Sequence, residues 1–313
     1  MMLTSFAIGQ FPVSLRDLVN LTLGGAVPPM VETVIVQVRL PRVLGAVLVG
    51  AALAAAGAAY QGMFRNPLVS PDILGVSAGA GLGAVLGIFL SLPVIAIQTL
   101  AFAFGLATVF LVYLIAVAVR GNDPVLVLVL AGVVMGTLAG AVISLLKILA
   151  DPYDQLPAMT FWLLGSLASL NPADIKAALP MVLIGLAPLY LLRWRMNLMS
   201  LEEEEGRALG VDTTRLRLLF IVAATLMTAA AVSISGIVGW VGLIMPHVAR
   251  MLVGPNFDRL LPASMLLGAM YLLLVDNLAR SLTVTEVPLG ILTAFLGAPF
   301  FLWLLASGRR VWQ

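Results

Sequence analysis

The sequence predicts an all-α protein that crosses a lipid bilayer many times. It has 313 residues, of which 61% are hydrophobic and 10% charged, whereas a water-soluble domain carries about a quarter charged residues. The apolar residues recur in runs of about 20, the length at which a helix spans the hydrocarbon core. Helices are required, because isolated apolar strands would leave backbone groups unpaired in lipid.

Nine apolar segments are expected to be the membrane-spanning helices of a single transmembrane domain over 1–313. They cover residues 43–62, 74–91, 96–119, 124–148, 178–192, 216–235, 238–253, 260–280 and 289–306.

The lysines and arginines predict the orientation. With the first span running from outside to inside, eleven of them fall on the inner side and six on the outer side. Basic residues are enriched in cytoplasmic loops. We therefore expect a multi-pass protein of the cytoplasmic (inner) membrane, with its C-terminus in the cytoplasm and its N-terminus outside.

Two longer polar segments lie on opposite sides of the predicted bilayer. The outer one, 149–176, contains a short apolar stretch at 161–170 that we interpret as a half-buried helix on the outer face. The inner one is 193–215. Within it Ser200 and Glu203 have the spacing of a capping box, and Gly210 is a plausible helix stop.

Glycines recur every fourth residue in two of the spans. This small-xxx-small spacing lets helix backbones approach closely in lipid, and it fits both static packing and a moving gate. We expect these glycines to pack against protein: Gly75, Gly79, Gly83, Gly87, Gly132, Gly136 and Gly140.

Several chemistries are excluded by composition. Cysteine is absent and His247 is the only histidine, so disulfides, thiolate sites and a histidine-based metal centre are not expected. No basic block points to nucleic acid. An HExxH motif is absent as well, and we expect a transport subunit with no catalytic residue, metal or cofactor of its own.

The two lysines exclude a P-loop. Such a loop needs Lys directly after Gly, whereas Lys147 follows Leu146 and Lys176 follows Ile175. If ATP drives this protein, another chain must bind the ATP and Mg²⁺.

An ion-coupled secondary transporter is the main alternative function, and a structural or assembly subunit is the second. Ion coupling usually needs ionisable residues buried in the membrane, and Asp276 is the main candidate. Arg280 follows it by one helical turn, so the pair is also explained as a salt bridge near the outer surface.

Six segments, spread over most of the chain, resemble the FecCD or BtuC-like (type II) permeases of iron-siderophore, haem and vitamin B12 ABC importers. They are RLPRVLGAVLVGAALAAAGAAYQGMFRNPLVSPDILGVSAGAG (39–81), LVLAGVVMG (128–136), FWLLGSL (161–167), SLEEEEGRALGV (200–211), GIVGWVGLIMPHVAR (236–250) and EVPLGILTAFLGAPFFLWLL (286–305). The resemblance implies a pair of permeases, expected here as a homodimer, with two cytoplasmic ATP-binding subunits and an external substrate-binding protein. It also implies about ten helices, so that most of a first helix is expected to be missing before the segment that begins at Phe6.

The resemblance also implies roles for particular residues. Arginines matching Arg39, Arg42 and Arg280 grip acidic residues of the binding protein at the outer surface, although interfacial snorkelling also explains the first two. The 193–215 segment would couple to the ATPase through Leu201, Glu203, Arg207, Ala208, Leu209 and Gly210. The cytoplasmic gate would comprise Asn66, Leu68, Val125 and Leu126.

His247 is expected to satisfy a helix contact rather than to bind solute. Ferric siderophore is the first choice of cargo by analogy with relatives, and haem, cobalamin and molybdate remain open.

Overall fold

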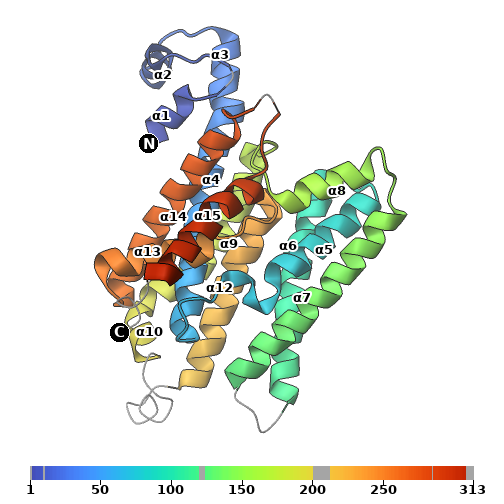
Figure 1. Ribbon diagram of the computed structural model, residues 1–313. Coiled ribbons are helices and arrows are strands. Elements are labelled where there is room, and N and C mark those ends of the chain that lie inside the picture. The colour runs from blue at the N-terminus through green and yellow to red at the C-terminus, as the bar shows by residue number, and fades with distance from the viewer. Residues whose placement is uncertain (1, 10, 120–123, 200–211, 284, 308–313) are drawn as a thin grey trace.

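The computed structural model describes residues 2–9, 11–119, 124–199, 212–283 and 285–307, and over these residues the secondary structure is helical, with no strand. Figure 1 shows the helices as one bundle, with α1–α3 at one end and α10 at the other. The elements are α1 (Met2–Ala7), α2 (Leu15–Thr22), α3 (Pro29–Thr33), η1 (Val34–Arg39), α4 (Leu40–Met63), η2 (Pro71–Leu74), α5 (Val76–Phe89), α6 (Val94–Ala118), α7 (Pro124–Leu149), α8 (Gln155–Leu164), α9 (Pro172–Leu191), α10 (Arg193–Leu198), α12 (Thr213–Ser235), α13 (Val241–Val253), α14 (Phe257–Ala279) and α15 (Leu289–Ser307).

The membrane-spanning helices confirm the predicted fold class. Within the described residues, six helices are long and apolar enough to cross a bilayer, and α5, α13 and α15 are shorter apolar helices. Each of the nine predicted segments overlaps one of these helices. The first prediction, 43–62, was too short, because α3, the π-helical turn η1 and α4 form one helical run of 35 residues over Pro29–Met63.

Helices α4 and α12 form the centre of the bundle. In the most apolar part of the Pro29–Met63 run and of α12, 78% of the residues are buried, against 28% in α6, α7 and α9. The centre is close-packed because α4 is rich in glycine and alanine. A Cβ on Gly57 would lie 1.8 Å from the carbonyl oxygen of Gly242 in α13, and one on Gly50 would lie 2.3 Å from that of Gly268 in α14. Glycine at these crossings brings the backbones into direct contact.

The predicted glycine stripes are only partly buried in protein. A Cβ on Gly79 or Gly83 would collide with α6, and one on Gly132 would lie 2.2 Å from the carbonyl oxygen of Ile73 in η2. By contrast, Gly136 has only the Ala78 Cβ at 3.9 Å, and Gly140 has nothing within 4 Å. Gly140 therefore has no close contact within the described chain, because that part of α7 faces outward, and its packing role stays a prediction.

The short helix of the 149–176 segment begins and ends earlier than predicted. It is α8, Gln155–Leu164, and it stops at Gly165, whose φ of +75° disfavours any other residue. Beyond it, the Ser166 amide donates to the Ser235 carbonyl at 2.8 Å, and the Leu289 amide donates to the Gly165 carbonyl at 2.9 Å. The 165–170 stretch is thus held by α12 and the start of α15 rather than by helical hydrogen bonds.

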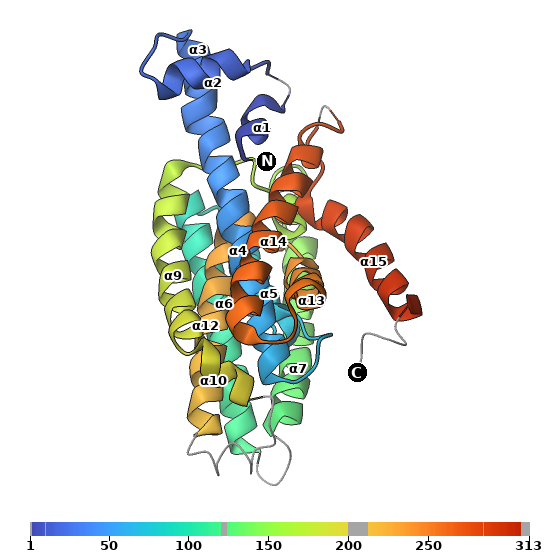
Figure 2. The same ribbon diagram turned by 90° about the vertical axis from the view of Figure 1, so that its left-hand side faces the viewer.

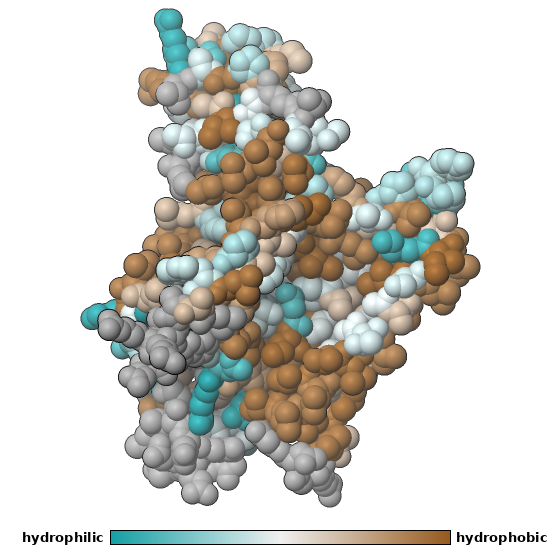
Figure 3. All heavy atoms as spheres, viewed as in Figure 1, coloured by the Kyte–Doolittle hydropathy of each residue, from teal (hydrophilic) through white to brown (hydrophobic). Residues whose placement is uncertain are grey.

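Helices α7 and α15 leave a large apolar surface uncovered. Figure 2 shows α15 leaning away from the bundle, and Figure 3 shows hydrophobic residues over much of the α7 side. Their exposed side chains include Leu130, Val134, Leu138, Phe295 and Leu302. A surface of this kind faces either lipid or another protein.

Candidate functional site

Three arginines predicted as a docking site lie together at the end of the bundle that carries α1–α3. Arg39 ends η1, Arg42 is in the first turn of α4, and Arg280 follows the last residue of α14. Because α4 and α14 pack along their lengths, arginines far apart in the sequence meet at one end. Their exposed fractions are 4%, 5% and 6%.

Two carboxylates neutralise part of this arginine cluster. Arg42 Nε lies 2.7 Å from Asp276 Oδ1, and its Nη1 lies 2.5 Å from Glu286 Oε1. Arg280 Nε lies 3.4 Å from Asp276 Oδ2, which confirms the predicted pairing one turn apart. Sequence reasoning did not identify Glu286, because the residue lies after α14, in a segment whose path the sequence does not reveal.

The N-terminal segment covers the remaining donors of the cluster. Arg39 donates to the carbonyl oxygens of Phe6 and Phe11, and Arg280 Nη2 donates to that of Ser5 at 2.7 Å. Gly9 fits here because it lacks a side chain: a Cβ would lie 3.1 Å from Arg39 Nη2, and its φ is +141°. The three arginines are therefore buried in this structure, where the carbonyls of Ser5, Phe6 and Phe11 and two carboxylates occupy them. Their docking role stays a prediction.

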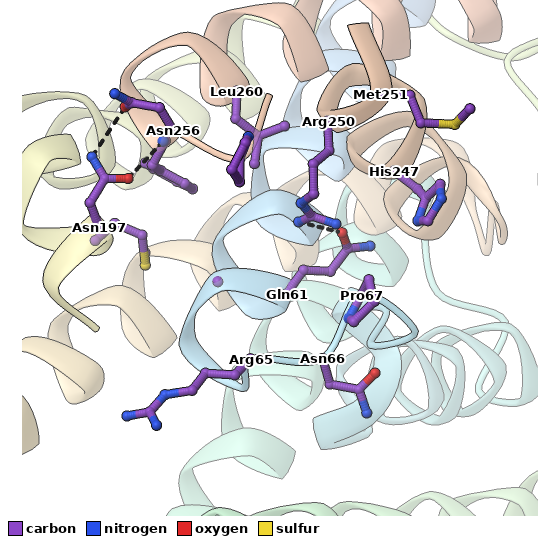
Figure 4. Close-up of a pocket in the computed structure, with 14 residues that line it drawn as sticks. Gln61, Arg65, Asn66, Pro67, Asn197, His247, Arg250, Met251, Asn256 and Leu260 are labelled. Carbon is purple, nitrogen blue, oxygen red and sulfur yellow. Dashed lines mark hydrogen bonds between the residues drawn. The ribbon is translucent and has the colours of Figure 1, made fainter. Parts of the chain in front are cut away.

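The opposite end of the bundle contains a cavity of about 860 Å³. It lies between the end of α4, α10, α13 and the start of α14, roughly 30 Å along α4 from the arginine cluster. Figure 4 shows Arg250 of α13 and Gln61 of α4 facing each other in it, while Asn197 and Asn256 form a second pair. The sequence reasoning did not identify this cavity, although Asn66 lines it, because its walls come from helices that are far apart in the sequence.

His247 lines the same cavity and is 6% exposed. The residue belongs to α13, and its side chain is buried inside the bundle rather than placed in a cluster of metal ligands. In the described part of the chain, no group of three or more histidine, cysteine, aspartate or glutamate side chains could hold a metal ion.

The predicted gate residues lie at this end too, and Asn66 is one of the residues that line the cavity. Asn66 and Leu68 are exposed in the turn after α4, where the Asn66 carboxamide oxygen accepts from the Leu68 amide at 2.9 Å. Val125 and Leu126 begin α7, and Leu126 is exposed. Their gating role stays a prediction.

The predicted coupling residues Leu201, Glu203, Arg207, Ala208, Leu209 and Gly210 lie outside the described residues. The structure does describe the approach to them: α10 ends at Leu198, and Arg65 Nε donates to the Met199 carbonyl at 2.9 Å. This contact ties the 193–215 segment to the turn after α4.

Comparison with known proteins identifies the family. The model of the FecCD transport family matches residues 1–307. The molybdate import permease MolB of Haemophilus influenzae is 43% identical over 301 residues, which are 95% of this chain and 89% of that protein. The cobalamin import permease BtuC of Halobacterium salinarum is 46% identical over 280 residues, 89% of this chain and 75% of that one. The hemin transport permease HmuU of Yersinia pestis is 36% identical over 319 residues, 98% and 92% of the two chains.

Solved structures agree with this result. A metal-chelate type ABC transporter in an inward-facing conformation is 42% identical, with a TM-score of 0.89 over 98% of this chain and 95% of that chain. PsaBC from Streptococcus pneumoniae, solved in complex with Fab, is 17% identical with a TM-score of 0.63 over 92% and 94% of the two chains, and shares the fold. The chain belongs to the FecCD transport family and is a multi-pass membrane permease of the ABC importer class.

Proposed function

We propose that the chain is the transmembrane permease subunit of an ATP-driven importer of an iron chelate. The observation that carries this proposal is its similarity, along almost its whole length, to a metal-chelate type ABC transporter. In this proposal α1–α3 face the outside of the cytoplasmic membrane, α10 and the C-terminus face the cytoplasm, and an external binding protein delivers the cargo.

Energy would come from two cytoplasmic ATP-binding chains. Neither lysine of this chain can serve a P-loop, so ATP and Mg²⁺ would be bound by the partner. The structure gives no support to a proton relay at Asp276, because that carboxylate is fully buried between Arg42 and Arg280.

A second copy of the permease would cover the apolar surface of α7 and α15. The uncovered part of α7 includes Gly140, where a Cβ would meet nothing in the described chain within 4 Å. A small-residue stripe of this kind suits a close helix contact in lipid. The cargo would pass between the two copies, with Asn66, Leu68, Val125 and Leu126 at the cytoplasmic end of the path.

A ferric siderophore is the proposed cargo, and the relatives set the alternatives. Permeases named for iron chelatin in Helicobacter pylori and for Fe(3+)-citrate in Bacillus subtilis are 45% and 39% identical. Those named for molybdate and cobalamin are 43% and 46% identical. Because these values are close together, identity does not rank the cargoes, and the choice rests on the number of relatives named for iron compounds.

Co-purification and uptake test this proposal. The tagged permease is expected to co-purify with an ATP-binding chain, and the complex in proteoliposomes is expected to take up a ⁵⁵Fe-labelled siderophore supplied with its binding protein. Uptake of ⁹⁹Mo-molybdate or labelled cobalamin instead would keep the importer and replace the cargo. A permease that purifies without any ATP-binding chain and transports nothing with one would contradict the proposal.

A further inference from the structure

A narrow groove runs between α6 and α9. Both helices pack on α12 rather than mainly on each other, and α12 forms the floor of the space between them. This α6–α9 groove has a volume of about 150 Å³ and is lined by α6 between Ile95 and Phe102, by α9 between Ala177 and Met181, and by α12 between Ala230 and Ile234. Figure 2 shows α9 and α15 on opposite sides of the bundle. A second permease copy on the α15 side would therefore leave the groove uncovered.

The groove exists because small side chains line it. Ala177 and Ala178 contribute to it from α9, and Ala230 and Ser233 form part of its floor. These two floor residues are 2% and 7% exposed, so the floor lies in the interior of the bundle. An empty space of this kind forfeits the dispersion contacts of the atoms around it, and a ligand that enters it restores those contacts.

The polar groups of the α6–α9 groove are already hydrogen-bonded. The hydroxyls of Thr99 and Ser233 donate to carbonyl oxygens of their own helices, at 2.7 Å and 2.9 Å. Gln98 Nε2 donates to Asp174 Oδ1 at 3.0 Å, which bridges α6 to the first turn of α9. The groove therefore presents apolar surface, and its chemistry fits a hydrocarbon chain rather than a polar molecule.

The groove lies at membrane depth, close to the end of the bundle that carries the arginine cluster. Helices α6 and α9 are both long and apolar enough to cross a bilayer, and 28% of the most apolar part of each is buried, so much of their surface faces lipid. A Cβ on Gly45 of α4, one turn beyond Arg42, would lie 3.4 Å from Ile175 Cδ1, which places the start of α9 at that end. A helix is about 10 Å across and is too wide to enter a groove of about 150 Å³, whereas one acyl chain is thin enough.

We propose that the α6–α9 groove binds one acyl chain of a phospholipid, with the phosphate of that lipid at Lys176. Lys176 is exposed and directly precedes Ala177, which lines the groove. A lysine near the end of a membrane-spanning helix places its ammonium among the lipid headgroups, where it attracts phosphate. The nearest acidic residue in sequence, Asp174, is buried, and its carboxylate accepts from Gln98 and from the Asn171 amide. The proposed orientation puts this lipid in the outer leaflet, but the site requires only that the chain spans a membrane.

Photo-crosslinking in nanodiscs tests the site. The full-length permease is placed in phospholipid nanodiscs that contain a trace of phosphatidylglycerol with a diazirine in one acyl chain, and the labelled residues are identified by mass spectrometry after irradiation. Labelling is expected to be severalfold higher at Met181 than at Leu183 and Ile184, which lie at a similar depth of α9, are more exposed and do not line the groove. Random contact with bulk lipid would follow exposure and give the opposite order.

Two substitutions test the acyl chain and the headgroup separately. Ala177→Leu fills the groove and is expected to lower the labelling of Met181 severalfold. Ala187→Leu is the matched control, because Ala187 is an exposed alanine of α9 outside the groove, and it is expected to leave the labelling of Met181 unchanged. Lys176→Gln is expected to lower this labelling severalfold through loss of the charge, whereas Lys176→Arg keeps the charge and is expected to retain it.

Labelling that follows exposure along α9, or that Ala177→Leu leaves unchanged, would overturn the site. Unchanged labelling in Lys176→Gln would overturn the assignment of the phosphate. Loss of Met181 labelling when the permease is assembled with its ATP-binding chain and binding protein would mean that a protein covers the groove, and would also overturn the proposal. None of these measurements depends on transport, so the lipid site can fail while the proposed importer function holds.

Discussion

Buried charge is the main residue-scale feature of this permease. Arg42, Asp276, Arg280 and Glu286 form one network at the end of α4 and α14, and their groups are held in fixed positions. Buried ion pairs contribute little net stability when intact but are costly to break, because removing one partner leaves an uncompensated charge.

Removing the Asp276 charge is therefore expected to destabilise the fold. Asp276→Asn leaves two buried guanidinium groups with one fewer carboxylate and is expected to cost about 3–5 kcal/mol, measured as the free energy of unfolding in mixed detergent micelles. The matched control is Asp258→Asn, whose partner Arg193 is 35% exposed and whose loss is expected to cost about 0–1 kcal/mol. Equal effects of the two changes would show that the network is not buried as described.

The N-terminal segment makes a second residue-scale prediction. Gly9→Leu introduces a side chain against Arg39, in a backbone conformation that L residues rarely adopt, and is expected to displace residues 5–11 from the arginine cluster. Since the chain has no cysteine, Ser5→Cys can report this displacement through its rate of maleimide labelling. Ser5 is fully buried. Labelling of Ser5→Cys alone is therefore expected to be slow, and labelling is expected to be at least severalfold faster when Ser5→Cys is combined with Gly9→Leu.

Gly24→Leu is the control for this experiment. Gly24 also has a positive φ, +76°, but a Cβ there meets nothing within 4 Å, so this variant adds leucine at a positive-φ glycine without the clash. Unchanged labelling in both variants would mean that the segment does not depend on the contact between Gly9 and Arg39. Displacement is also the step that would make the three arginines available to an acidic binding protein.

At the scale of elements, close helix crossings define the bundle. The α4–α13 crossing depends on Gly57, whose added Cβ would meet backbone that cannot rotate away. Gly57→Ala is expected to destabilise the fold by about 1–3 kcal/mol through overpacking. Gly140→Ala, measured on the monomeric chain in detergent, is the control, because α7 is open there without a second copy, and it is expected to stabilise by about 0.5–1 kcal/mol, the usual advantage of alanine over glycine in a helix. Similar destabilisation by both changes in an unfolding titration would argue against the crossing.

The segment between α10 and α12 has an expected role in coupling. Deleting Leu201–Leu209 is expected to leave ATP hydrolysis by the partner chain but to abolish its dependence on cargo, measured as ATPase activity with and without loaded binding protein. Coupled uptake that persists after the deletion would remove this segment from the mechanism.

The elements themselves were largely predictable from sequence, and their surroundings were not. Apolar length identified the helices, because a bilayer imposes a minimum span. It did not reveal the extension of the first span to Pro29, since Arg39 and Arg42 interrupt the apolar run while the backbone continues through them. The helix α8 was misplaced because Gly165 ends it with a φ of +75°, at a point where a Cβ would lie 2.6 Å from the Ile237 carbonyl oxygen.

The candidate sites were likewise predictable only in part from the sequence. Arg39, Arg42 and Arg280 were identified by resemblance, and the structure brings them together. Their burial beneath residues 5–11 could not be predicted, because it depends on main-chain carbonyls, which carry no sequence signal. The pairing of Gln61 with Arg250 was missed for a related reason: the two residues are 189 positions apart and meet only through the crossing of α4 and α13.

At the scale of the whole molecule, the chain is expected to need partner proteins for transport. Its described residues have a buried arginine cluster at one end, an open cavity at the other and an uncovered apolar side on α7 and α15. In the proposed function, each of these features would face a different partner: a binding protein, an ATP-binding chain and a second permease copy. Transport by this chain is expected to depend on ATP that is bound by a separate chain.

Uptake by proteoliposomes is the direct test of this dependence on ATP. Vesicles containing the permease with its ATP-binding chain are given the loaded binding protein, with ATP or without it, and with or without ionophores that collapse ion gradients. We expect uptake only when both the ATP-binding chain and ATP are present, and no effect of the ionophores. Uptake by the permease alone, driven by an ion gradient and abolished by the ionophores, would contradict the account and identify a secondary transporter.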